Sequence, residues 1–142
     1  MNHYSLLLLL AIVFPTFASA GNSDVVAAKN TREAYEIVKA ADRFTVGGVG
    51  YAGRPSESEI AFRQLLKQPN PLILCQKLLG EATPSGQLYG LLGLRLLDRK
   101  AFQAVLPRYR TSKVDVPTMS GCIVIKTTTA SIAEKIDKGK YK

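Results

Sequence analysis

Apolar side chains recur every three or four residues along most of this sequence, which is the spacing of one face of an α-helix. The pattern is clear over residues 22–41, where Ala34 and Val38 share a face and charged residues lie mostly opposite. Four more segments follow in quick succession: residues 56–68, 70–80, 83–97 and 98–110. Because the links between them are short, we expect neighbouring helices to lie antiparallel.

Residues that commonly begin helices stand at the start of these segments. Ser56 and Glu59 have the spacing of a capping box. Proline occupies the first helical position after two further capping residues, and an aspartate begins the last of the four segments: Asn70-Pro71, Thr83-Pro84 and Asp98. These local signals place the predicted helix starts.

The segment 83–97 is apolar around nearly its whole circumference, which is typical of a helix buried on all sides. It also contains Gly86, Gly90 and Gly93. Each glycine weakens a helix by about 1 kcal/mol relative to alanine. This pattern predicts that another helix approaches this one very closely.

The period changes after Arg110. Residues 113–116 alternate polar and apolar side chains, residues 117–121 are typical of a turn, and residues 122–125 form an apolar run. We therefore expect a β-hairpin whose second strand is buried. A last helix is predicted over 130–138, with Ser131 and Glu134 as a capping box, and the basic tail 140–142 is expected to fray.

These elements predict a mainly α fold, a compact domain of about six helices arranged as stacked antiparallel hairpins, with a small C-terminal two-stranded β element. Residues 56–110 resemble HEAT-like helical hairpin repeats, chiefly in the run Gly-Leu-Arg-Leu-Leu-Asp at 93–98. The resemblance implies stacked helical hairpins, a scaffold that usually binds other proteins. No period recurs three times, as a complete solenoid requires.

The N-terminus has the pattern of an export signal. An unbroken apolar run, Leu6 to Phe14, is followed by Pro15 and then by the small-residue pattern Ala18-Ser19-Ala20. The run is much shorter than the ~20 apolar residues that span a bilayer. We expect cleavage after Ala20, which leaves a single helical domain of residues 21–142 in the periplasm or outside the cell. The alternative is a retained anchor.

Export changes the interpretation of the two cysteines, Cys75 and Cys122. An oxidising compartment and an even number of thiols favour a disulfide between them. Cys75 lies on an apolar helical face and Cys122 in the predicted apolar strand, so two buried free thiols remain the alternative.

The candidate chemistry is sparse. His3 is the single histidine and belongs to the predicted signal, so histidine-dependent catalysis and metal sites with histidine ligands are not expected. Two carboxylate pairs, Glu33 with Glu36 and Glu57 with Glu59, are explained by solvated helix faces and helix caps. We therefore predict no catalytic residues, no metal, no cofactor and no enzyme, with a hydrolase that uses carboxylates alone as a remaining alternative.

Residues 48–53 match the Gly-x-Gly-x-x-Gly pattern of dinucleotide-binding loops. That motif requires a helix directly after the loop, and here Arg54-Pro55 intervenes. We instead expect a turn or an exposed recognition loop from which Tyr51 and Arg54 project.

The charge is strongly positive, with 19 basic and 11 acidic residues and a formal net charge of +8. Basic residues are dense between Arg95 and Lys113, where Asp98 is the single acid. Tyrosine and arginine are enriched at interface hot spots. The candidate partner-binding residues are therefore Tyr51, Arg54, Arg99, Arg108, Tyr109 and Arg110.

These observations predict a small exported, non-enzymatic binding or inhibitory protein of the periplasmic immunity or inhibitor type, whose partner is another exported protein with an acidic surface. An envelope-associated structural domain that binds an anionic polymer or a membrane surface is the alternative. We expect no nucleic acid, because no nucleic-acid-binding motif is present. The oligomeric state stays open.

Overall fold

The computed structural model describes residues 21–142, and the predicted export signal lies outside the described residues. It contains six helices and one two-stranded antiparallel sheet, so the predicted mainly α class is confirmed. None of the described helices is long and apolar enough to cross a membrane. In chain order the elements are α1 (Gly21–Lys39), α2 (Glu57–Leu65), α3 (Pro71–Glu81), α4 (Pro84–Leu97), α5 (Arg99–Arg110), β1 (Asp115–Ser120), β2 (Ile123–Thr128) and α6 (Thr129–Asp137).

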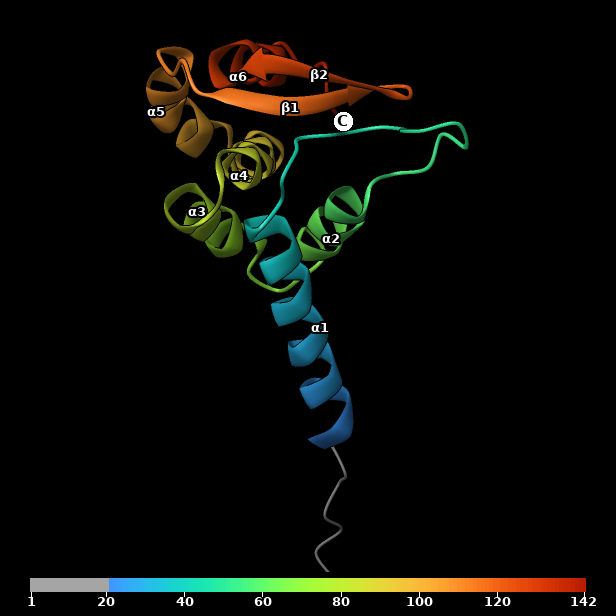
Figure 1. Cartoon of the computed structure of the whole chain (residues 1–142). Coiled ribbons are helices and arrows are strands. Elements are labelled where there is room, and N and C mark those ends of the chain that lie inside the picture. The colour runs from blue at the N-terminus through green and yellow to red at the C-terminus, as the bar shows by residue number, and fades with distance from the viewer. Residues whose placement is uncertain (1–20) are drawn as a thin grey trace, which may run out of the picture.

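Helix α4 occupies the centre of the fold, with the other helices and the hairpin arranged around it (Figure 1). Its residues from Ser85 to Leu94 are buried except Gln87, as its apolar circumference predicts. Tyr89 is fully buried, and its hydroxyl donates to the carbonyl oxygen of Thr45 at 2.7 Å and accepts from the N–H of Thr45 at 3.1 Å. These two bonds tie the segment after α1 to the core.

The glycines of α4 allow the close approach that their spacing predicts. A Cβ at Gly90 would lie 2.8 Å from the carbonyl oxygen of Cys75 in α3, and one at Gly86 would lie 2.5 Å from the carbonyl oxygen of Val38 in α1. No side chain fits in either gap. Both neighbouring backbones therefore depend on glycine at these positions.

Most helix starts agree with the predicted caps. The side chains of Ser56, Thr83 and Asp98 accept hydrogen bonds from backbone N–H groups in the first turns of α2, α4 and α5. Asn70 makes no side-chain cap bond. At α6 the cap is Thr128 in place of the expected Ser131, because the helix begins directly at the end of β2.

The hairpin is longer than predicted, and its turn is confined to Gly121-Cys122. Gly121 has a φ of 58°, the left-handed value that a tight hairpin turn places at glycine. Val116 and Thr129, at the base of the hairpin, are buried against the helices. The rest extends beyond the body (Figure 1), so the prediction of a buried second strand is wrong: Ile123–Ile125 are exposed, and none of residues 21–142 forms a layer over them.

The C-terminal tail is docked on the body, contrary to the expected fraying. The ring of Tyr141 packs edge-on against the buried ring of Phe44, with 5.3 Å between centroids. The guanidinium of Arg63 donates to the carbonyl oxygen of Lys142 at 3.0 Å. An aromatic side chain close to the end of the chain gives the tail an apolar anchor.

Candidate functional site

The glycine-rich loop and the hairpin turn lie side by side and project from the same side of the molecule (Figure 1). The N–H of Gly50 donates to the carbonyl oxygen of Gly121 at 2.9 Å, which joins the two turns. Within the loop, Val49 and Arg54 form an isolated antiparallel bridge. Gly50 and Gly53 adopt left-handed φ values of 71° and 59°, which explains why glycine is needed there.

A buried carboxylate holds the base of this loop. Glu59 in α2 accepts from the N–H of Gly47 at 2.8 Å and from the guanidinium of Arg63 at 2.7 Å. Its side chain is almost fully buried, whereas Arg63 is about half exposed. Glu59 is thus committed to the fold, but its carboxylate binds the loop and Arg63 and does not form the helix cap predicted for it.

The two turns together present large side chains to solvent. The exposed fraction is 103% for Tyr51 and 69% for Ile123, and it declines along β2 to 44% at Ile125. Arg54 is exposed on the same loop. We call this region the tip surface, and it comprises Tyr51, Arg54, Ile123, Val124 and Ile125.

The basic residues that are dense between Arg95 and Lys113 in the sequence do not gather at one point on α5. Arg99 and Arg108 are exposed but stand about 13 Å apart along the axis, at 1.5 Å per residue. Arg110 forms an ion pair with Asp137 of α6 at 2.7 Å. The exposed cations of this helix therefore lie towards its two ends, and the guanidinium of Arg110 is paired with a carboxylate.

Tyr109 is a core residue, so its predicted place on a partner-binding surface is wrong. It is 3% exposed, and its hydroxyl donates to the side-chain oxygen of Gln87 at 3.3 Å. Burial raises the pKa of its hydroxyl, with an opposing contribution from Arg108. Tyr109 is buried because the apolar stripe of α5 that contains Phe102 and Leu106 continues to it at helical spacing.

The structure brings Tyr51 and Arg54 together but separates them from the basic residues of α5. The hairpin begins near the end of α5 and runs away from it towards the tip surface (Figure 1). A six-residue strand spans about 20 Å. The predicted partner-binding residues therefore belong to two different surfaces.

The expected disulfide is not formed, and both thiols are free. Cys75 is fully buried between α3 and α4, whereas Cys122 is exposed in the hairpin turn. The extended hairpin moves Cys122 away from the core, which separates the two sulfur atoms. Burial raises the pKa of the Cys75 thiol to about 12, so it is a packing residue with little thiolate character.

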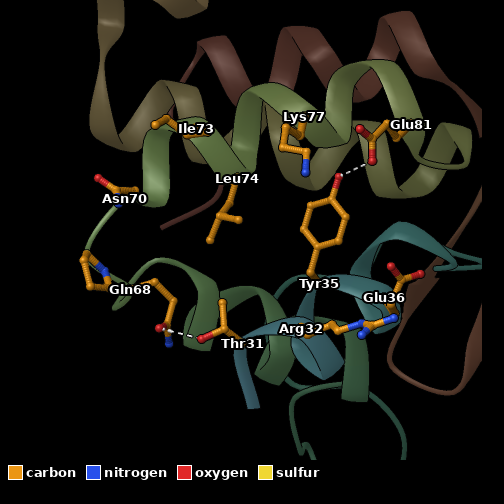
Figure 2. A pocket seen from close by; sticks show the side chains of 11 residues that line it. Thr31, Arg32, Tyr35, Glu36, Gln68, Asn70, Ile73, Leu74, Lys77 and Glu81 are labelled. Atoms are coloured by element: carbon orange, nitrogen blue, oxygen red, sulfur yellow. Dashed lines mark hydrogen bonds between the residues drawn. The ribbon is translucent and has the colours of Figure 1, made fainter. Parts of the chain in front are cut away.

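A groove of about 760 Å³ lies between α1 and α3 (Figure 2). Tyr35 points across it, with its hydroxyl donating to Glu81 at 2.9 Å and the ammonium of Lys77 at 5.4 Å from its ring centre. Thr31 donates to Gln68 at 2.7 Å along the same groove. These contacts join the elements that form the walls and explain the groove as a seam between helices.

Sequence reasoning missed Ile123, Val124 and Ile125 as surface residues. An uninterrupted run of β-branched residues is typical of a buried strand, and here it lies in solvent. The available signal was the number of predicted strands, because a sheet of two strands has no interior strand.

The tip surface offers apolar contact and an arginine for recognition, whereas the buried Glu59 and Cys75 are committed to hydrogen bonds and to packing, respectively. Among residues 21–142 no group of three cysteine, histidine or acidic side chains is placed to hold a metal ion. No protein-family model matches this chain, and no curated protein is significantly similar to it.

Proposed function

We propose that this chain is a small exported protein without catalytic activity, which binds or inhibits another exported protein by direct contact. The observation that carries the proposal is the tip surface: Tyr51 and Arg54 are exposed on the glycine-rich loop, and Ile123 and Val124 are exposed on the hairpin to which that loop is bonded. The partner presents an acidic surface that complements the net charge of +8. We place the protein in the periplasm or outside the cell, after removal of residues 1–20.

The composition of the tip surface supports a protein partner. Soluble proteins seldom leave neighbouring large apolar side chains exposed unless they contact another molecule. Tyrosine and arginine supply most of the binding free energy at many interfaces. Tyr51 and Arg54 are not needed to fill the core, so their selection is best explained by contact with a partner.

Helix α5, which lies near the base of the hairpin and away from its turn (Figure 1), supports a second candidate function. Arg99, Lys100 and Arg108 are exposed on α5 and form no ion pair with any side chain described between residues 30 and 142. Such cations would bind an anionic envelope polymer or lipid surface. The affinity of that binding would fall steeply with ionic strength.

Recovery of the tagged full chain from its native compartment would separate these functions. We expect a partner protein to remain bound at moderate salt and to be lost from a Tyr51→Ala/Arg54→Ala variant, each change weakening binding about 5- to 30-fold. The matched control, Arg99→Ala/Arg108→Ala, should retain the partner. Salt-sensitive binding of envelope polymer that only the α5 variant loses would favour the second function. If the full chain bound neither a partner protein nor an envelope polymer, both proposed functions would be contradicted.

A further inference from the structure

The outer edge of β2 has unused backbone hydrogen-bonding groups. The carbonyl oxygen of Pro117 in β1 accepts from the N–H of Phe44 at 2.9 Å, so it points away from β2. Pro117 lies opposite Lys126 in the hairpin. Because the carbonyl oxygen of Pro117 points outward, these two residues form a non-hydrogen-bonded pair of the antiparallel ladder. The N–H and carbonyl groups of Lys126 therefore point away from β1.

The same alternation places the backbone groups of Val124, two residues earlier, on the outer edge. Across residues 21–142, neither Val124 nor Lys126 has a backbone hydrogen bond outside the hairpin. Two donors and two acceptors are thus directed outward. They have the spacing that an additional strand requires.

The two edges of the hairpin differ in how they are covered. The segment at Phe44 runs along β1 and bonds to it, and Pro117 removes a donor from that edge. No segment in the described range 21–142 covers the edge of β2 in this way, and Ile123 and Ile125 on one face and Val124 on the other are exposed. Folded proteins usually shield an open apolar edge, because it templates pairing with another chain.

We infer that the outer edge of β2 docks an extended strand of the partner, which pairs with Val124 and Lys126 and places an acidic side chain opposite Lys126. This inference rests on the proposed function, because it specifies how a protein partner binds. Strand addition of this kind derives affinity from main-chain hydrogen bonds and selectivity from the alternating side chains.

The positive charge of Lys126 indicates which kind of strand binds the outer edge of β2. Lys126 is the single charged residue of β2, and the chain as a whole carries +8. A second copy would bring another +8 and offers no acid in its own β2 to pair with Lys126. A cross-strand pair of opposite charges is favourable, whereas like charges are not. An extended segment that alternates apolar residues with an acid fits both the edge and the charge.

The probe is a capped ten-residue peptide of alternating valine and threonine with one central glutamate, titrated into the isotopically labelled protein. We expect the backbone amide resonances of Val124 and Lys126 to shift. Their hydrogen exchange should slow, because the peptide accepts hydrogen bonds from both N–H groups. A peptide with lysine in place of glutamate should bind about three- to tenfold more weakly. Equal binding of the two peptides, or no shift on β2, would overturn the inference.

Val124→Pro provides the decisive variant. The substitution removes an outward N–H and no hydrogen bond to β1, as native Pro117 does on the other strand. Val124→Ala is the matched control, because it shortens the side chain but keeps the N–H. Peptide binding should be lost in Val124→Pro and only weakened in Val124→Ala, which shortens a side chain of the tip surface, with equal melting temperatures confirming that both fold. Unchanged binding in Val124→Pro would refute strand addition.

Failure here can be told apart from failure of the proposed function. A native partner that still binds Val124→Pro but not Tyr51→Ala/Arg54→Ala would leave the binding function intact and reject the β2 edge. A dimer of the unmodified protein that Val124→Pro dissociates would replace the acidic partner with a second copy. Binding to anionic vesicles that Val124→Pro leaves unchanged, without peptide binding, would also reject the inference.

Discussion

Glycines concentrate in two regions of this protein, the α3–α4 contact and the loop that leads to the tip surface, and they act differently in each. In α4, Gly90 has helical geometry, and its missing Cβ makes room for the backbone of Cys75. In the loop, Gly50 has open space around it but a φ of 71°. The first region uses glycine to pack backbones closely, and the second uses it to shape an exposed turn.

The same contrast extends to the other side chains of the two regions. The helical body contains Cys75 in α3 and Tyr109 in α5, and the two neighbouring turns contain Tyr51 and Cys122; sequence reasoning considered all four for a functional role. Cys75 and Tyr109 are buried among the helices, whereas Cys122 and Tyr51 are exposed on the neighbouring turns. Residue type alone does not distinguish a packing residue from a contact residue, and pairs of matched variants can test the distinction.

Alanine substitutions of Tyr109 and Tyr51 should differ most in their effect on stability. Tyr109→Ala is expected to lower the free energy of unfolding by about 3 kcal/mol, because it leaves a cavity beside α4. Tyr51→Ala should change it by less than about 0.5 kcal/mol, since that side chain is fully exposed. Urea denaturation of both variants measures the difference, and equal losses would remove the distinction between the regions.

Gly90→Ala should destabilise the protein by about 1–3 kcal/mol, because the added methyl group overlaps the backbone of α3. Gly80→Ala in α3 is the matched control. Nothing lies within 4 Å of a Cβ there, so the better helix propensity of alanine should stabilise the protein by up to about 1 kcal/mol. A lower melting temperature for Gly90→Ala and a higher one for Gly80→Ala would confirm that the space available, and not helix propensity, explains the glycine at position 90.

Alkaline pH should weaken the packed region through Cys75. Its thiol has a pKa of about 12 in the folded protein against a usual value of 9.0. The unfolded chain therefore releases this proton first, and stability falls as pH rises from about 9 towards 12. Near pH 10.5 the expected loss is about 2 kcal/mol. Compared with the unmodified protein, Cys75→Ala should lose less stability between pH 8 and pH 10.5. Parallel pH curves would contradict this.

The two thiols should react in sequence. In the native protein a thiol reagent should modify Cys122 rapidly and Cys75 only after unfolding, because only Cys122 is exposed. Modification of Cys122 should leave the melting temperature nearly unchanged, because its side chain is exposed and the hydrogen bond that joins the turn to the glycine-rich loop involves the backbone of Gly121. Protein from the native compartment with no reactive thiol, and a mass lower by two hydrogens, would restore the disulfide.

Much of the helical fold could be predicted because its signals are local. Ser56, Thr83 and Asp98 each cap the helix that follows them, and the glycines of α4 predicted close packing. The candidate site was predicted only in part. Tyr51 and Arg54 do project from the loop, but the exposed strand beside them was assigned to the core.

The sequence by itself determined where the helices begin, that α4 is central, and that the loop must contain glycine, because these depend on neighbouring residues and on backbone geometry. Only the tertiary structure decided that Tyr109 is buried, that the two cysteines lie apart, and that β2 has an open edge. Each of these depends on which distant element covers the residue. Apolar periodicity indicates that a side chain can be buried, but the residues that cover it must come from elsewhere in the chain. For β2, no described residue covers the outer edge.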